Sequence, residues 1–330
     1  MLRTETRDET AVRPGSKLRQ LFPTGEIYLV SDDETLEHAA DHYGLRGVAL
    51  ADAAKLPGDA NVVLFLRHSL VSVEVRRLFE NSRVLFVPVA SFDPAPETAL
   101  YTQRLTMLTD FAAARDLSAY WVNSLASEPG PLFFGDRARR PGGPAATRLT
   151  CTLDSELNTD VWLKHTIEAG EWVGVGTLCE VSLTPPSLTD WGGYTIDGTA
   201  VASGVLVAED ARHDADLDPR FRAARQLRDE LSGRGPITLR FEEGVLTRAE
   251  AGGEDFTAAV LEATNPEYGL HTIELGIGTN LGVRPHVDWR LNSQLNEGAG
   301  VVHLGFGEGI TGAHMDFVIA ECAHSFGAGR

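Results

Sequence analysis

The chain has 330 residues, of which 43% are hydrophobic, and carries a formal net charge of −18 from 29 basic and 47 acidic side chains. This length exceeds what a single hydrophobic core usually supports, so two domains are expected. The excess of negative charge repels phosphate groups, which argues against nucleic acids and membranes as partners and favours a cationic ligand. Residues 1–14 are charged, and no apolar run approaches the ~18 residues of a membrane span, so we expect a flexible N-terminal tail and a cytoplasmic protein.

Residues 15–145 are predicted to form an open α/β domain with a mostly parallel sheet. Apolar runs of strand length alternate here with stretches of helical periodicity, which is the pattern of such a sheet. The first predicted strand, 26–30, is followed by Ser31 and Asp32, either of which can cap a helix that runs to about His42. The further predicted strands are 47–50, 61–66 and 83–87, and the further predicted helices are 73–79 and 97–115. No glycine-rich phosphate-binding string follows these strands, so the sequence does not support nucleotide binding.

Residues 146–330 are predicted to form a strand-rich α+β domain. A stretch rich in proline and glycine, 128–144, separates it from the first half. A segment near 208–235 is predicted to be an insertion, with an acidic loop followed by an amphipathic surface helix at 219–231. The predicted short strands are 148–153, 180–183, 201–207, 237–241 and 244–248.

Four residues of the kinds that bind metals, Glu274, His303, His314 and Asp316, occur in the last third of the chain, close to glycines. Carboxylates and imidazoles on segments that glycine allows to approach closely are what a divalent-cation site requires. If 314–316 is a strand, His314 and Asp316 project from the same face because side chains alternate with a period of two. A simple surface pair of these two residues, and a hydrogen-bonded core histidine at position 303, are the alternatives.

The order of several strings in this half resembles the thermophilic metallo-aminopeptidases of the aminopeptidase T type and the related iron-dependent 2,5-dihydroxypyridine dioxygenases. The likeness covers roughly residues 171–318 and rests on EVSLTPP at 180–186, ITLRFEEG at 237–244, ELGIGTN at 274–280, VHLG at 302–305 and HMDFV at 314–318. The resemblance implies a homodimer in which one or two divalent ions (Zn, Mn, Co or Fe) are held by Glu180, Glu274, His303, His314 and Asp316.

Two further residues are candidates for substrate contact at the rim of this site. His286 lies in the string RPHVDWR at 284–290, and Trp191 lies in WGGY at 191–194, where its ring could form an aromatic wall. Ordinary surface structure at His286 and ordinary turn packing at Trp191 are the alternatives.

Two classes of function remain open from the sequence. The first is a metal-dependent enzyme acting on a peptide or an amino-acid-derived small molecule, by hydrolysis with two cations or by oxygen chemistry on a single Fe(II) held by two histidines and one carboxylate. The second is a peptide-binding protein that presents a precursor peptide to a modifying enzyme. It is favoured by the stretch after His303, LGFGEGI, which lacks the tyrosine that the peptidases carry there.

Overall fold

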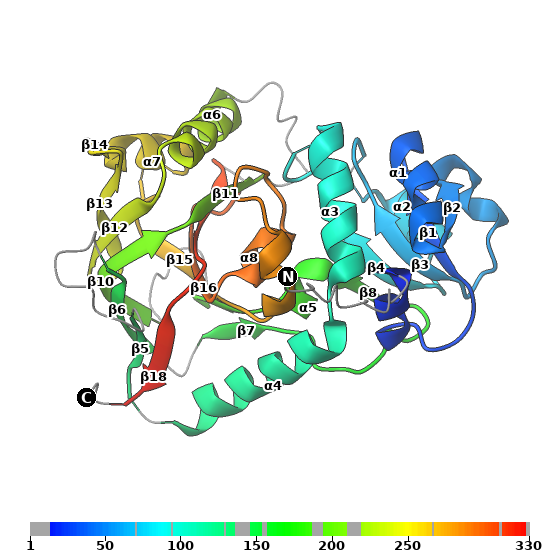
Figure 1. The fold of residues 1–330 in the computed structure, drawn as a ribbon, viewed down its shortest axis with the longest axis horizontal. Coiled ribbons are helices and arrows are strands. Elements are labelled where there is room, and N and C mark those ends of the chain that lie inside the picture. The colour runs from blue at the N-terminus through cyan, green and yellow to red at the C-terminus, as the bar shows by residue number, and fades with distance from the viewer. Residues whose placement is uncertain are drawn as a thin grey trace, which may run out of the picture.

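The computed structural model describes residues 14–69, 71–93, 95–128, 130–135, 146–153, 157–186, 194–209, 219–265, 267–309 and 312–327. It has an α/β fold, with one parallel sheet in the first half and two antiparallel sheets in the second (Figure 1). The tail predicted at the N-terminus lies outside the described residues except for Pro14, where the 3₁₀ helix η1 (Pro14–Gln20) begins.

The parallel sheet has five strands in the order β2-β1-β3-β4-β8. These are β1 (Ile27–Ser31), β2 (Arg46–Ala49), β3 (Asn61–Phe65), β4 (Arg83–Val87) and β8 (Trp172–Gly174). Strands β1 and β3 are buried along their whole length, as expected for central parallel strands that are covered on both faces. The helices of this half are α1 (Glu34–Ala39), η2 (Ala40–Tyr43), η3 (Leu50–Lys55), α2 (Val73–Leu78), α3 (Pro96–Leu108) and α4 (Phe111–Ser127).

Helix α1 is capped one residue later than predicted. The side chain of Asp33 accepts hydrogen bonds from the backbone of Thr35 and Leu36, so Asp33 is the N-cap and the prediction of Ser31 or Asp32 was wrong. The carboxylate of Asp32 instead accepts from the backbone N–H groups of the turn 67–69 after β3. It therefore joins two turns at the same end of the sheet.

The single helix predicted at 97–115 is two helices, α3 and α4. The chain turns at Thr109 and Asp110, and the carboxylate of Asp110 accepts a hydrogen bond from the backbone of Ala113 to cap α4. The hydrophobic periodicity of the sequence continues across this turn. The periodicity therefore does not show where α3 ends and α4 begins.

The second half contains two antiparallel sheets. Sheet B has the order β14-β13-β12-β10-β6-β5-β18, and sheet C has the order β11-β17-β16-β15-β9-β7. The strands of sheet B are β5 (Leu132–Gly135), β6 (Arg148–Leu153), β10 (Tyr194–Ala202), β12 (Ile237–Glu242), β13 (Val245–Ala251), β14 (Glu254–Asp255) and β18 (Ala323–Phe326). The strands of sheet C are β7 (Asn158–Asp160), β9 (Glu180–Thr184), β11 (Gly204–Ala208), β15 (Thr272–Gly278), β16 (Val302–Phe306) and β17 (His314–Ile319). The predicted strand 201–207 is the end of β10 and most of β11, with Ser203 between them.

One face of sheet C packs against sheet B to form the largest core of the molecule. Alternate residues of the central strands, such as Leu275, Leu304 and Phe317, belong to this core together with Leu149 and Leu239 of sheet B. The residues between them therefore project from the opposite face, toward the short helix α8 (Leu295–Ala299), which contacts β15 and β17. The remaining helices are α5 (Val175–Cys179), α6 (Pro219–Gly233), α7 (Thr257–Ala263) and η4 (Leu281–His286).

The predicted amphipathic helix is α6. Its buried residues Phe221, Ala224, Leu227 and Leu231 recur every three or four positions, and the helix packs against β11 and α7. Of the acidic loop before it, residues 210–218 lie outside the described part of the chain.

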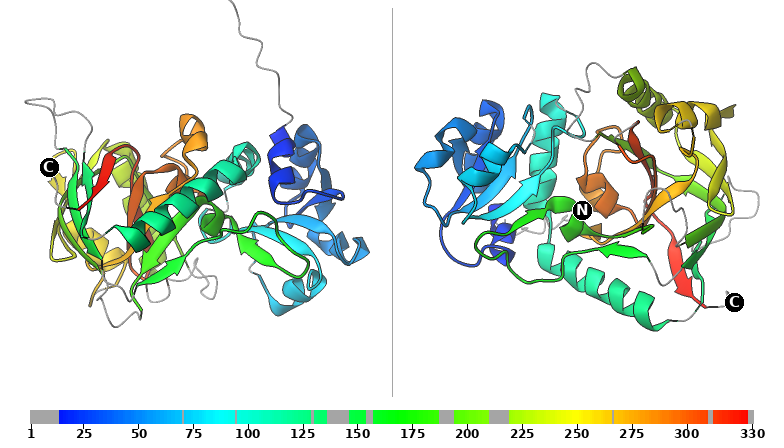
Figure 2. Two further views of the ribbon diagram at one scale, coloured as in Figure 1. Left: turned by 90° about the horizontal axis from the view of Figure 1, so that it is seen from below. Right: turned by 180° about the vertical axis from the view of Figure 1, so that it is seen from behind.

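The chain crosses more than once between the two halves, which lie side by side (Figure 2). Strand β5 pairs with β6 across the stretch rich in proline and glycine, and β8 then returns to complete the parallel sheet beside β4. Buried hydrogen bonds hold α3 against α8 and the loop before it: Tyr101 Oη lies 2.7 Å from Asn296 Oδ1, and Thr102 Oγ1 lies 2.8 Å from Ser293 Oγ. These bonds fix the parallel sheet relative to sheet C.

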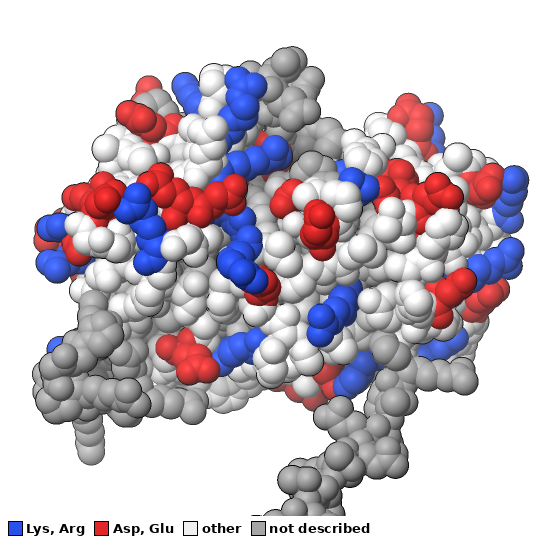
Figure 3. Space-filling view, turned by 45° about the horizontal axis from the view of Figure 1, so that its top comes forward, with Lys and Arg blue, Asp and Glu red and all other residues white. Residues whose placement is uncertain are grey.

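Within the described residues, no helix is both long and apolar enough to cross a membrane. On the face shown in Figure 3, acidic and basic side chains are interspersed.

Candidate metal centre

The five residues that the resemblance points to lie on one face of sheet C. Strands β9, β15 and β16 contribute one residue each, and β17 contributes two, because the His-x-Asp pair does lie on a strand. The register places Gly276 opposite His303 and Gly305 opposite Asp316, so these positions share the face that points away from the large core. The residues brought together are Glu180, Glu274, His303, His314 and Asp316.

Two glycines make room for these side chains. A Cβ atom on Gly276 would lie 1.9 Å from Cε1 of His303, so the imidazole lies directly over this backbone. A Cβ atom on Gly305 would lie 2.8 Å from both Glu274 Cβ and His314 Cε1. Any side chain at either position would collide with the cluster, which explains why glycine accompanies the candidate ligands in the sequence.

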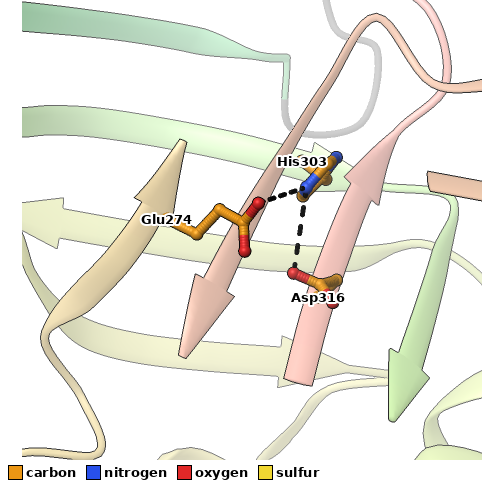
Figure 4. Close-up of side chains that lie close together, drawn as sticks. All are labelled: Glu274, His303 and Asp316. Atoms are coloured by element: carbon orange, nitrogen blue, oxygen red, sulfur yellow. Dashed lines mark ion pairs between the residues drawn. The ribbon is translucent and has the colours of Figure 1, made fainter. Parts of the chain in front are cut away.

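The nitrogen and oxygen atoms converge on a small volume (Figure 4). Nε2 of His303 lies 3.7 Å from Oε2 of Glu180, 3.7 Å from Oε1 of Glu274 and 4.0 Å from Oδ1 of Asp316. Nε2 of His314 lies 3.2 Å from Oε2 of Glu274 and 3.0 Å from Oδ1 of Asp316. Glu274, His303 and Asp316 each offer one ligand atom within 4.8 Å of the others, so this triad could hold a metal ion.

Two supporting contacts orient the cluster. Nδ1 of His314 lies 2.6 Å from the carbonyl oxygen of Gly307, and an N–H donated there directs Nε2 toward Glu274 and Asp316. The hydroxyl of Ser182 on β9 donates a hydrogen bond to Oε1 of Glu274. Such contacts fix the ring and carboxylate orientations that a ligand set needs.

Buried negative charge dominates the electrostatics of the site. Burial lowers the pKa of His303, but the nearby carboxylates of Glu274, Glu180 and Asp316 outweigh it and raise the pKa to about 9. Burial, together with the charges of Glu274 and Asp316, raises the pKa of Glu180 to about 8. Burial also opposes the charge on His314, but Asp316 and Glu274 raise its pKa well above the usual value. The surrounding carboxylates therefore favour the charged form of both imidazoles.

Several buried polar atoms of the site are poorly satisfied. Oε2 of Glu180 and Nδ1 of His303 make no hydrogen bond within the described part of the chain, and Oδ1 of Asp316 faces Nε2 of His314 at 3.0 Å. Glu180 is 7% exposed and Asp316 is 1% exposed, and no described Lys or Arg forms an ion pair with either. A carboxylate oxygen buried in this way is costly, so the donor set fits a divalent cation bound by oxygen and nitrogen ligands.

Two further carboxylates lie near the cluster and were not found from the sequence. Glu297 on α8 is buried, and its pKa is raised well above the usual value by burial and by the charges of Asp316 and Glu180. The sequence does mark Glu297, because it is the only Asp, Glu, Lys or Arg between Arg290 and Glu308. A lone charge in such a stretch could have identified it as a candidate site residue. Asp160 on β7 is opposite Ser182, and burial and the charge of Glu274 raise its pKa. No local pattern marks Asp160, because strand pairing alone brings it here.

Of the two predicted rim residues, the structure describes only His286. His286 ends the 3₁₀ helix η4 with an exposed side chain, and the neighbouring Asp288 forms an ion pair with Arg290 in which Oδ2 lies 2.7 Å from Nη2. Trp191 lies outside the described residues.

Comparison with known proteins gives one family and no curated relative. None of the curated proteins matches this chain. The family described as crocagin biosynthetic protein CgnE/B matches residues 24–327, which include both the parallel sheet and the strands that carry the carboxylates and histidines. The chain therefore belongs to the CgnE/B family of crocagin biosynthetic proteins.

Proposed function

We propose that this chain is a divalent-cation-dependent biosynthetic enzyme that acts on a peptide or an amino-acid-derived small molecule. The observation that carries the proposal is the convergence of His303 Nε2 with oxygens of Glu180, Glu274 and Asp316 at 3.7–4.0 Å, of which the Glu180 oxygen is buried without a hydrogen bond. The similarity to the aminopeptidase T type and to the dioxygenases of the same fold supports the same ligand set.

Glu274, His303 and Asp316 would hold the first ion. Glu180, which lies beside His303, and His314, which lies beside Glu274 and Asp316, would supply the further ligands for a second ion. When bound, the cation would supply Lewis-acid activation of a water and a carbonyl group, or oxygen chemistry if it is Fe(II). Ser182 orients Glu274, and the carbonyl of Gly307 orients His314. Helix α8 packs against β15 and β17, the strands that carry Glu274, His314 and Asp316.

Metal analysis tests this proposal. The purified protein is stripped, reconstituted anaerobically with Zn, Mn, Co or Fe(II) in turn, and compared with the variants His303→Gln and Asp316→Asn. We expect one or two ions per chain in the native protein and a loss of affinity in each variant larger than the ~10–100-fold typical of supporting residues. His286→Ala is the matched control, because this histidine is exposed and is not in the cluster. A native protein that stays empty under all four metals contradicts the proposal.

A second candidate is the peptide-binding protein that presents a precursor peptide to a modifying enzyme. The family is described as a biosynthetic protein, which is compatible with this role, and residues 304–309 after His303 provide no hydroxyl group to assist a reaction. Calorimetry with peptides distinguishes the two. Tight binding that is unchanged by a chelator favours presentation, whereas turnover that the chelator abolishes favours the enzyme.

A further inference from the structure

We infer that helix α8 and strand β9 form a cation position lined by oxygen alone, in which Glu180, Gln294 and Glu297 bind a hard divalent cation such as Mg²⁺ or Ca²⁺. The inference rests on the proposed function and sharpens it, because it places the second ion on the Glu180 side of the cluster and takes its further ligands from α8. In this arrangement His314, whose Nε2 lies 3.0 Å from Oδ1 of Asp316, joins the first ion.

The side chains of Glu180 and Gln294 meet over the backbone of Gly176 in α5. A Cβ atom on Gly176 would lie 3.0 Å from Oε1 of Glu180 and 2.5 Å from Nε2 of Gln294, so both groups approach the same point. Gly176 does not have a positive φ, so its backbone conformation does not require glycine. The absence of a side chain at position 176 instead leaves room for these two polar groups.

The two oxygens of Glu180 face different neighbours. Oε2 lies 3.7 Å from Nε2 of His303 in the cluster, whereas Oε1 lies beside Gln294. A carboxylate whose oxygens are directed to two sides can bind one cation on each side, as in two-metal sites with ions roughly 3.5–4 Å apart. Glu180 is therefore placed to join the cluster to a second ion next to α8.

Glu297 lies on the same side of α8 as Gln294. The backbone N–H of Glu297 donates to the carbonyl of Gln294, and residues three apart in such a turn are neighbours. Glu297 is 6% exposed, and its carboxylate makes no hydrogen bond or ion pair with the residues that the structure describes. Helix α8 packs against β15 and β17, and the charges of Asp316 and Glu180 raise the pKa of Glu297, so this carboxylate lies near the cluster.

The unsatisfied atoms of this group are those that a hard cation needs. Oε1 of Gln294 and Oε2 of Glu180 are buried and have no hydrogen-bond partner in the described part of the chain. Rotation of the Gln294 amide exchanges its oxygen and nitrogen, so that its oxygen can face Glu180. Two carboxylates and an amide oxygen, completed by water, suit Mg²⁺ or Ca²⁺, whereas Zn²⁺ prefers nitrogen and sulfur ligands.

Isothermal titration calorimetry with Mg²⁺ and with Ca²⁺ tests the inference. The full-length protein is first loaded with one equivalent of Zn, and the Zn content is measured before and after each titration. The variants Glu297→Gln and Gln294→Leu each remove a ligand oxygen while nearly conserving side-chain volume. Glu262→Gln is the matched control, because Glu262 is an exposed carboxylate on α7.

We expect the native protein and Glu262→Gln to bind one Mg²⁺ or Ca²⁺ per chain, and each α8 variant to bind it about 10-fold or more weakly with its Zn content unchanged. A native protein that binds neither ion, or α8 variants that bind as tightly as the native protein, would overturn the inference. Loss of Zn from the α8 variants would also overturn it, because these residues would then belong to the first ion. Failure of the proposed function looks different: the native protein then retains no Zn, and the Mg²⁺ and Ca²⁺ titrations still report on the position beside α8.

Discussion

At the scale of single residues, the glycines decide whether the site can exist. Gly276→Ala places a methyl group where the His303 ring now lies, at 1.9 Å from Cε1. Because the ring is 1% exposed and has no free space to enter, we expect the variant to lose about 1–3 kcal/mol of unfolding free energy and to bind cations weakly. Denaturant unfolding and metal titration measure the two effects.

The control for this substitution is Gly282→Ala. No atom lies within 4 Å of the Cβ that it would introduce, and its backbone does not require glycine. Equal effects of the two substitutions would show that the close approach of His303 to Gly276 has no structural importance.

Much of this site could be predicted from the sequence, because short-range patterns mark most of the candidate ligands. Glu274, His303, His314 and Asp316 each stand near a glycine on a short strand, and the alternation of side chains along β17 placed His314 and Asp316 on the same face, as observed. Asp160 could not be found in this way, because its position depends on which strand pairs with β9.

At the scale of elements, buried hydrogen bonds between α3 and the loops of the second half hold sheet C in place. Oη of Tyr101 lies 2.7 Å from Oδ1 of Asn296 and accepts a hydrogen bond from the backbone of Asp288. Tyr101→Phe removes the hydroxyl that pairs with the side-chain oxygen of Asn296 and with the backbone N–H of Asp288. We therefore expect a loss of about 1–3 kcal/mol of unfolding free energy. The substitution is measured by urea unfolding.

Tyr120→Phe is the control for this prediction, because Tyr120 is 50% exposed on α4. Its hydroxyl is open to solvent, and its removal should change stability by less than about 0.5 kcal/mol. If Tyr101→Phe is equally mild, the hydrogen bonds between the halves do not contribute to stability.

Four strands of the parallel sheet, β1 to β4, were predicted closely, since apolar runs bounded by polar turns mark buried strands. The fifth strand, β8, has only three residues and was not predicted. Helix ends and the turns between strands were predicted less well. The turn at Thr109 and Asp110 interrupts a stretch whose hydrophobic pattern continues on both sides, and so does Ser203, where the chain passes from sheet B to sheet C. Competition between local capping groups also decided the start of α1, where Asp33 is the cap and Asp32 binds a distant turn.

At the scale of the whole molecule, we expect the unfolding free energy to depend on pH, because residues of the site have shifted pKa values. The pKa of His303 is about 9 in the folded protein against 6.5 for the free side chain, so its protonation stabilises the cation-free fold fully below about pH 6.5. This stabilisation, on the order of 3 kcal/mol for a shift of this size, is lost as the pH rises through 9. The raised pKa of Glu180, about 8, acts in the same direction.

We therefore expect the unfolding free energy of the chelated protein to fall between pH 6.5 and 9, and the fall to be smaller in His303→Gln. Added cation should reverse the trend, because the imidazoles must release their protons to bind it and affinity rises with pH. The measurement is thermal unfolding across this range with and without metal. A native stability that is flat with pH in the absence of metal would contradict the assignment of charged histidines.

The central claim is that one cation binds between Glu274, His303 and Asp316. Anomalous diffraction from crystals of the reconstituted protein, collected at the Zn, Mn, Co and Fe edges, tests it most directly. The account predicts a peak about 2.0–2.3 Å from His303 Nε2 and from the nearer oxygens of both carboxylates. No peak in this cluster at any edge, with His303 still paired to the carboxylates, would contradict it.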